Sequence, residues 1–412
     1  MKKLLITLLL IIYYPPPSIA QLPPDNPNYE LVFEDNFDSI AMDQTKWYSG
    51  YPWNQKGYID VSYCNNFPDP LLKNDLYGYR KRNFENCLCD TTGTGQINII
   101  SIKENYTGIV WAWPECSNDS CIGLPCDSTY NPPICFDIDT LSFNYTTNML
   151  RSKELFKYGY FEIRCKISKP NPPMSNTGIG PNFWLWRTNS EVGWSEIDIF
   201  EFNGNTNSFT SNIHYENIYG DTIHGIPNSP GYIEVDFNDF HIFSINWTPE
   251  KIDFYLDGEC YVTSYEYSED LIPMPMIIDV NFPLHTMCQF IDSTTQLPHD
   301  FIIDYVRVYQ LISDCSNDYQ ICDFSNIEYK HYRNIYVGDS SCVVTIPQNE
   351  IFHLVYSEKI YVSPNFILED GASINFERTP CFSNIHITDY PEFSGPAPPS
   401  FFRRQNPIYH EY

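Results

Sequence analysis

The stretch Tyr160-Phe161-Glu162-Ile163-Arg164-Cys165-Lys166-Ile167 decides the fold class, because apolar and polar residues alternate in it from Phe161 onward. A period of two places the two sets of side chains on opposite faces of a β-strand. Similar runs at 241–247, 252–256 and 301–309 are separated by turn residues and not by helical segments. We therefore predict an all-β fold, an antiparallel sandwich.

Changes of composition divide the chain into parts. Residues from about 65 to 133 are rich in Asn, Asp, Cys, Gly and Pro, which is typical of long loops over the rim of a sandwich. Shorter strands follow Gln310, and Pro recurs in the last segment. We predict a main domain at 21–311 that contains this Cys-rich insertion, a small β-rich accessory module at 312–388 and a Pro-rich tail at 389–412.

The N-terminus predicts export. Lys2 and Lys3 precede an apolar run at 4–14, and small residues follow at the usual cleavage spacing, so residues 1–20 are expected to be a signal peptide. We expect the protein to be secreted or held at the cell surface, without a later membrane span. Disulfide bonds are then expected among the 14 cysteines, with the connectivity left open. A zinc site is the rival interpretation, but the spacings lack a repeated C-x2-C motif.

Charge and aromatic content limit the classes of molecule that the protein is expected to bind. With 24 basic and 52 acidic residues the formal charge is −28, which argues against nucleic acid and anionic membranes. Aromatic residues make up 16% of the chain. Their flat faces stack on sugars, although β-strands are rich in aromatics in any case.

The stretch Trp194-Ser195-Glu196-Ile197-Asp198-Ile199-Phe200-Glu201-Phe202 carries the chemistry. On a regular strand Glu196 and Asp198 share a face, whereas Glu201, five residues beyond Glu196, points to the other face. One extra residue at Ile199-Phe200, a β-bulge, would return Glu201 to the first face. We predict this bulge and, with it, three carboxylates along one groove.

Three neighbouring carboxylates suit a retaining glycosidase, which needs a nucleophile and an acid about 5–5.5 Å apart. Close like charges raise the pKa of at least one carboxyl, so one group can stay protonated while another is ionised. Asp198, between the two glutamates, is then placed to orient Glu196 and to hold a proton. The alternative is an ordinary solvent-facing acidic strand.

Tryptophans adjoin this stretch. Trp184 and Trp186 share one face of the run 182–186, and Trp194 directly precedes the carboxylates. We expect them to bind substrate as the aromatic walls of a sugar cleft. The alternative is that at least one of them fills the core.

These and further stretches resemble glycoside hydrolase family 16, the family of laminarinases, lichenases, agarases and κ-carrageenases. The stretches that carry the resemblance occur in the family's order, at 31–38, 149–153, 158–164, 182–186, 196–201, 212–215, 240–249 and 304–309. The resemblance implies a β-jelly-roll sandwich at 21–311. It also implies endo action, with cleavage inside the polysaccharide chain and retention of the anomeric configuration. By position, Glu196 matches the nucleophile, Asp198 the assisting carboxylate and Glu201 the acid/base.

The resemblance bears on four further positions. His214 is expected to contact substrate or Asp198, with a purely structural role as the alternative, and Asn281 matches a strand position near the cleft. Asp304 matches one ligand of a structural calcium ion, whereas Asn36 stands where many relatives have Glu. No cofactor is expected for catalysis.

The leading hypothesis is a monomeric endo-hydrolase of β-1,3- or mixed β-1,3-1,4-glucan. Hydrolysis of a marine galactan such as agar or carrageenan is the second, and it stays open because Trp194-Ser195 departs from the common pattern, with Ser195 in place of a common Gly. A carbohydrate-binding lectin without turnover is the third, although such a protein has no need of three crowded carboxylates. A transglycosylase differs only in whether sugar or water intercepts the glycosyl-enzyme.

Overall fold

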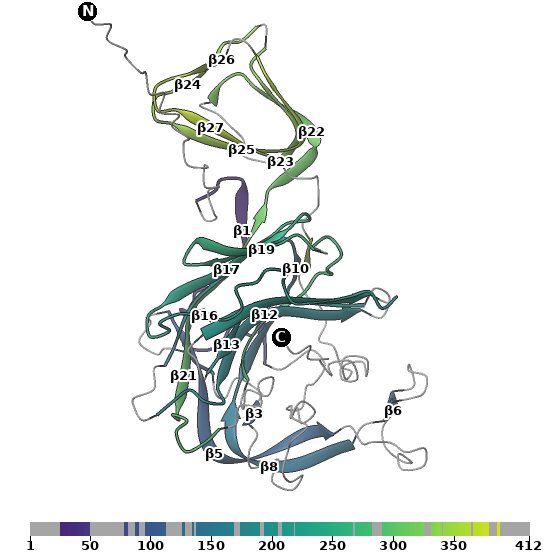
Figure 1. Cartoon of the computed structure of the whole chain (residues 1–412), viewed down its shortest axis with the longest axis vertical. Coiled ribbons are helices and arrows are strands. Elements are labelled where there is room, and N and C mark those ends of the chain that lie inside the picture. The colour runs from purple at the N-terminus through teal and green to yellow at the C-terminus, as the bar shows by residue number, and fades with distance from the viewer. Residues whose placement is uncertain are drawn as a thin grey trace, which may run out of the picture. The chain divides into compact units, whose positions relative to one another are not determined.

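The computed structural model describes residues 25–49, 78–80, 87–89, 95–112, 126–127, 134–135, 137–168, 174–189, 193–204, 208–217, 219–266, 268–281, 291–324, 331–339, 341–363, 366–378 and 385–387. Within these residues the regular elements are β-strands (Figure 1). The predicted signal peptide and the Pro-rich tail at 389–412 lie outside them. Across the described part of the chain, no helix has the length and apolar character to cross a membrane.

The first sheet has ten strands among the described residues. Along its main path the neighbouring strands are antiparallel except β3 with β8. Along its main path the strands are β19 (Glu259–Ser264), β18 (Ile252–Leu256), β17 (His241–Trp247), β11 (Gly159–Ile167), β21 (His299–Leu311), β5 (Ile97–Ala112), β8 (Asp137–Thr147) and β3 (Gly78–Arg80). β1 (Tyr29–Asp35) pairs with β21, and β4 (Cys87–Cys89) pairs with β5.

The second sheet is antiparallel and has eight strands within the described ranges. Its order is β15 (Thr222–His224), β14 (Ser208–Asn217), β13 (Gly193–Asn203), β12 (Gly180–Asn189), β20 (Met276–Asn281), β9 (Met149–Ser152) and β2 (Trp47–Tyr48), with β16 (Ile233–Glu234) on β14. Two short pairs lie outside both sheets, β10 (Leu155–Lys157) with β28 (Ile385–Ile387) and β6 (Cys126–Asp127) with β7 (Ile134–Cys135).

A core between the two sheets makes them a sandwich. Phe161 and Ile163 of β11 and Phe243 of β17 are fully buried in the same cluster as Phe200 and other residues of the second sheet. The ring centroids of Phe200 and Phe243 lie 4.4 Å apart, which is direct contact between the sheets. The predicted antiparallel jelly-roll sandwich is confirmed.

The chain divides into two compact units between Gln310 and Leu311, and the smaller unit has its own core. Its four-stranded sheet runs β22 (Ser313–Ile321), β23 (His331–Val337), β25 (Ile351–Val362) and β27 (Ser373–Arg378), beside the pair β24 (Val344–Ile346) and β26 (Phe366–Leu368). Every pair in this unit is parallel among the described strands. The module is β-rich as predicted, and its parallel pairing is a finding of the structure.

The edges of the two units differ from the predicted domain limits in two respects. The prediction ended the accessory module at residue 388, whereas β28 pairs with β10 and groups with the larger unit. Residues 25–30 group with the smaller unit, and the Ile312 amide donates to the Asn28 carbonyl oxygen at 2.8 Å.

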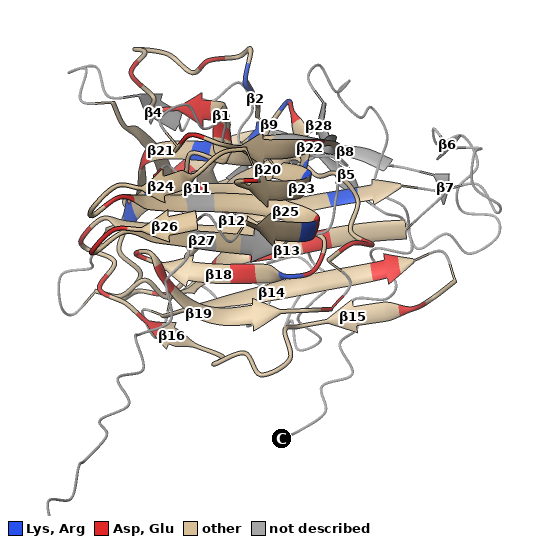
Figure 2. Ribbon diagram, turned by 90° about the horizontal axis from the view of Figure 1, so that it is seen from above, with Lys and Arg blue, Asp and Glu red and all other residues tan. Residues whose placement is uncertain are grey.

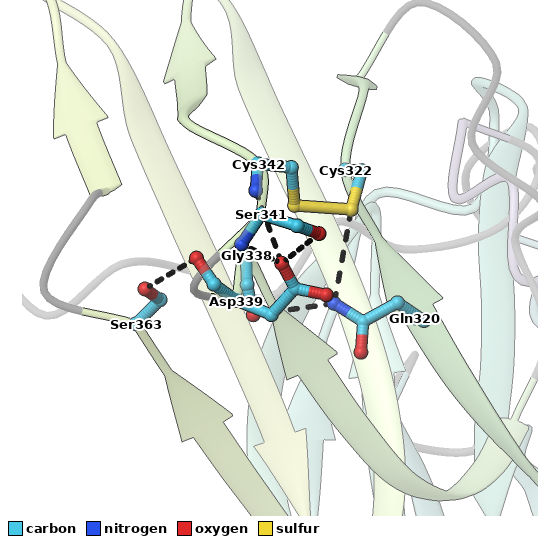
Figure 3. The surroundings of a disulfide bond; sticks show 7 residues. All are labelled: Gln320, Cys322, Gly338, Asp339, Ser341, Cys342 and Ser363. Carbon is cyan, nitrogen blue, oxygen red and sulfur yellow. Dashed lines mark hydrogen bonds between the residues drawn. A yellow bond between two sulfur atoms is a disulfide. The ribbon is translucent and has the colours of Figure 1, made fainter.

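Cysteines in the described residues follow two patterns. A disulfide joins Cys322 at the end of β22 to Cys342 (Figure 3), and Asp339 Oδ1 accepts hydrogen bonds from the Ser341 and Cys342 amides beside it. Cys165 is free and buried, and Cys260 is free and exposed. Cys165 belongs to the inward-facing set of β11, where it packs in the core as a small apolar residue.

β13 and β14 approach each other closely at Gly193, whereas Gly220 has open space around it. A Cβ added to Gly193 (φ +114°) would lie 1.9 Å from the Glu216 carbonyl oxygen, whereas one added to Gly220 (φ +89°) would meet nothing within 4 Å. Both Gly→Ala changes impose backbone strain of about 1–3 kcal/mol. We predict that Gly193→Ala lowers the free energy of unfolding by about 2 kcal/mol more than Gly220→Ala, because only it forces the strands apart. Chemical denaturation followed by tryptophan fluorescence measures the difference, and equal losses would contradict it.

Candidate active site

The bulge predicted in β13 is present at the predicted place. Asp198 is opposite Asn212 of β14, and Glu201 is opposite Thr210, so three steps along β13 match two along β14. Ile199 and Phe200 are both buried, with 1% and 0% of their surfaces exposed. Two consecutive residues therefore point into the core, and Glu201 returns to the face of Glu196.

Two contacts hold the bulge in shape. The Ser211 hydroxyl on β14 donates a hydrogen bond of 2.8 Å to the Ile199 carbonyl oxygen, which satisfies an acceptor at the point where the ladder is interrupted. Phe200 packs against Phe243 and Phe301 of the first sheet, with ring centroids 4.4 and 6.2 Å apart. Packing on one side and hydrogen bonding on the other fix the direction of Glu201.

The three carboxylates share the face opposite the core. Glu196 and Glu201 are half-buried, and Asp198 is 2% exposed. Asn212 Nδ2 donates to Glu201 Oε2 at 3.1 Å, and His214 Nε2 lies 3.4 Å from Asp198 Oδ2. The fold therefore brings together the three acids that were predicted from the sequence.

Burial and mutual repulsion change the acidity of the two glutamates. Loss of hydration raises the pKa of Glu196 well above its usual value, and the charges of Asp198 and Glu201 raise it further. Loss of hydration, followed by the charge of Asp198, raises the pKa of Glu201 to about 8, although His214 and Asn212 act in the opposite direction. At neutral pH Glu201 therefore carries a proton that it can donate.

On the same face, two histidines continue from Glu196 across the neighbouring strands. Glu196 is opposite His214 of β14, which is opposite His224 of β15. The Trp194 ring lies against both imidazoles, with centroids 6.4 and 6.3 Å away, and its Nε1 donates to Glu216 Oε2 at 3.3 Å. Trp194 is only 9% exposed.

The other predicted substrate residues are less uniform. Trp186 is opposite Glu196 and Trp184 is opposite Asp198, so both tryptophans are on the same sheet face as the carboxylates. Trp184 is half-buried, whereas Trp186 is 1% exposed and offers almost no surface to solvent. Asn281 ends β20 opposite Gly180, and only its backbone is described.

Sequence reasoning missed Asp279 and Asn212 as members of the site. Asp279 of β20 is fully buried, and its Oδ1 accepts hydrogen bonds from Asn182 Nδ2 at 3.0 Å and Trp184 Nε1 at 3.2 Å. An acid within the apolar run 276–280 was the available signal. Asn212 shares the strand parity of His214, which was a signal for the same face.

Ser195, which replaces a common Gly of the family pattern, has a structural contact. It is fully buried, and its hydroxyl accepts a hydrogen bond of 3.2 Å from the Ile272 amide. Its strand position has the parity of Ile197, which is in the core. Ser195 therefore lies behind the carboxylate face and is not part of it.

The described side chains do not fit the calcium site implied for Asp304. Arg164 Nη1 forms an ion pair with Asp304 Oδ2, and Gln96 Nε2 lies 3.5 Å from Oδ1. Asn36 Oδ1 accepts from Arg307. Arg164 already neutralises Asp304, and Arg307 already donates to the Asn36 oxygen. Calcium binding stays a prediction from resemblance.

Two described clusters have the residue types of a metal site. In the first, Cys322 and Cys342 are bonded to each other, so their sulfurs are not available to a metal. In the second, His214 and Asp198 face each other and pair within the carboxylate group. We assign neither cluster to a metal.

Comparison with known proteins identifies relatives of the part of the chain that contains this site. Residues 118–288 match the family model of glycosyl hydrolases family 16. A beta-glucanase of Acetivibrio thermocellus is 29% identical over 170 residues, which are 39% of this chain and 47% of the relative. A kappa-carrageenase of Pseudoalteromonas carrageenovora is 31% identical over 136 residues, 28% of this chain and 32% of the relative.

Among solved structures, the catalytic domain of an endo-1,3-beta-glucanase (laminarinase) from Thermotoga petrophila RKU-1 is similar to this chain with 24% identity and a TM-score of 0.43. That match covers 68% of this chain and 98% of the other. The chain spans about half the length of the first curated relatives that it matches.

The acidity of Glu201 makes a prediction about stability. Its folded pKa, about 8, exceeds the unfolded value near 4.5, so the folded state binds the proton more tightly and loses stability as pH rises from about 4.5 to 8. Glu201→Gln removes this loss. We predict equal melting temperatures near pH 4.5 and a rise of several degrees for the variant at pH 8.

Scanning calorimetry across this range measures the effect, with exposed Glu250→Gln as a control for the chemical change. A constant difference between Glu201→Gln and the parent at all pH values would contradict the shifted pKa.

Proposed function

We propose that this chain, whose residues 118–288 match the model of glycosyl hydrolases family 16, is a secreted endo-hydrolase that cuts a β-linked polysaccharide with retention of configuration. The observation that carries the proposal is the bulge at Ile199-Phe200, which gathers Glu196, Asp198 and Glu201 on one sheet face. The match to beta-glucanases supports it.

In the first step Glu201 acts as the general acid and Glu196 as the nucleophile. Glu201 holds its proton at neutral pH and donates it to the glycosidic oxygen as the bond to the anomeric carbon breaks. The carboxylate of Glu196 attacks the anomeric carbon from the opposite side of the sugar ring and forms a glycosyl-enzyme. The leaving chain departs with the proton of Glu201.

Asp198 assists by handling the charge of Glu196. Burial and nearby acids favour the protonated form of Glu196, so the nucleophile needs a partner that accepts its proton. Asp198, next to Glu196 on the same strand face, is placed to take that proton. In the second step Glu201, now ionised, takes a proton from water, and the resulting attack releases the sugar from Glu196.

The preferred substrate is a β-1,3- or mixed β-1,3-1,4-glucan. Beta-glucanases among the matched relatives support a neutral glucan, and a net charge of −28 disfavours a sulfated one. Figure 2 shows acidic residues in red along loops and strand ends of the described chain. The match to a kappa-carrageenase keeps galactan hydrolysis as the second candidate.

We also propose that the protein is exported and acts as a monomer. The predicted signal peptide supports export, as does a disulfide between Cys322 and Cys342, because such bonds persist in oxidising compartments.

Removal of either glutamate should stop turnover. We predict that Glu196→Gln and Glu201→Gln each lower kcat/KM by about 10³-fold or more, because a positioned acid or nucleophile contributes on that scale. Assays on laminarin, lichenan, agarose and carrageenan identify the substrate, and NMR of the first-formed anomer tests retention. Melting temperatures control for folding. Near-parental hydrolysis by either variant would end the assignment, and inversion would end the retaining mechanism.

The alkaline side of the pH profile should report the proton of Glu201. We predict that kcat/KM for the polysaccharide falls as pH rises through about 8, where Glu201 loses its proton. A dinitrophenyl β-glycoside needs little acid assistance, because its leaving group is already a stable anion, and its cleavage should fall much less there. If both substrates lose activity equally, Glu201 is not the acid.

A further inference from the structure

His224 on β15 lies on the same sheet face as the carboxylates of β13, with His214 of β14 between them. Directly opposed residues of antiparallel strands share a face, and Glu196, His214 and His224 are opposed in turn across β13, β14 and β15. His214 Nε2 lies 3.4 Å from Asp198 Oδ2, and its Nδ1 lies 3.1 Å from Nδ1 of His224. His214 is therefore held between an acid and a second imidazole.

The short contact between the imidazoles restricts where protons can reside. Two ring nitrogens 3.1 Å apart form a hydrogen bond only when one carries a proton and the other does not. The Asp198 carboxylate favours a proton on Nε2 of His214. If His214 also donates from Nδ1, it is an imidazolium with both N–H groups bonded, and His224 is neutral with its own proton on Nε2.

The charges around the pair favour this arrangement. Burial alone would lower the pKa of His214, but the hydrogen bond and charge of Asp198, together with Glu201, outweigh it and raise the pKa. Burial and the neighbouring charge of His214 lower the pKa of His224, and Glu216 offsets this in part. Glu196, Asp198 and Glu201 on β13 and Glu216 on β14 are the acids that face the pair in the described residues.

Packing fixes the relative orientation of the two rings. The Trp194 ring stacks on His214 with an interplanar angle of 24° and lies against His224 at 38°. Its Nε1 hydrogen bond to Glu216 anchors the indole to β14.

We propose that His224 is a positioning residue that accepts a hydrogen bond from the Nδ1–H group of His214 and so holds His214 as an imidazolium against Asp198. The inference rests on the proposed function for its consequence. An Asp198 whose charge is balanced repels the negative charge of Glu196 less, and Glu196 ionises more readily for attack. His224 acts through His214 and Asp198 and does not touch the reacting atoms.

Two variants of equal shape test the hydrogen bond. Asn and Leu have the same branched outline, but only Asn places an acceptor oxygen near the position of Nδ1. We expect His224→Leu to lower the pKa of His214 by at least one unit, seen in ¹⁵N NMR titration of the ring nitrogens, and His224→Asn to retain most of the parental value. Equal His214 titration in the two variants would overturn the proposal. This measurement needs no turnover, so it is decided separately from the proposed hydrolysis.

The pH profile of turnover supplies the second readout. We expect His224→Leu to lower kcat/KM at pH 7 about tenfold, one unit of pKa, and to move the alkaline limb to higher pH, because loss of the imidazolium removes a charge that lowers the pKa of Glu201. We expect His224→Asn to restore both. A limb that stays at the parental pH or moves to lower pH in His224→Leu would overturn the proposal. Melting temperatures that match between the two variants exclude a merely structural effect. A parental protein that cleaves no polysaccharide would refute the proposed function, while the NMR titration would still decide the role of His224.

Discussion

One strand has to satisfy two demands at once, and the site depends on how it does so. β13 supplies apolar residues to the core between the sheets and acids to the opposite face, and a regular strand would put Glu201 among the apolar ones. Placing Ile199 and Phe200 together in the core resolves the conflict. The Ser211 hydroxyl satisfies the Ile199 carbonyl, and the contact of Phe200 with Phe243 anchors the kink to the other sheet. The carboxylate geometry is thus held by the core.

The same arrangement concentrates negative charge where water is scarce, and the surroundings compensate for it unequally. Asn212 and His214 act on Glu201 and Asp198, whereas Asp279 adds further negative charge from β20 and is itself held by Asn182 and Trp184. The result is a site in which protons remain on carboxyl groups near neutral pH. Acid and nucleophile roles then follow from local contacts and not from residue type.

Much of this could be read from the sequence, because period-two alternation and the spacing of Glu196, Asp198 and Glu201 are local features. The bulge was predictable because Glu196 and Glu201, five residues apart, can point to one face only if the strand contains an extra residue. Asp279 was not accessible in this way, since it lies on a strand distant in sequence from β13. His224 lies on the strand that follows β14, but no local pattern sets the register that places it opposite His214. The burial of Trp186 and the parallel pairing of the smaller unit were equally hidden, because alternation is the same in both kinds of sheet.

Cysteine chemistry shows the same limit. Export predicts paired cysteines, yet Cys165 is free in the core and Cys260 is free at the surface. The position of Cys165 in the apolar set of β11 was the better guide to its role, since a small buried side chain there completes the packing. Asp304 is a comparable case: its partner, Arg164, lies on another strand, and only the folded register brings the two together.

The pairing of β28 with β10 bears on how this protein can be shortened. A chain that stops at residue 311 appears complete by composition, but it lacks Ile385–Ile387 and leaves Leu155–Lys157 without that neighbouring strand. Unpaired backbone groups at such an edge invite association with other chains. Along the sequence the smaller unit takes Leu311–Cys381 from within the larger one and residues 25–30 from before it, so no single cut or excision separates the two.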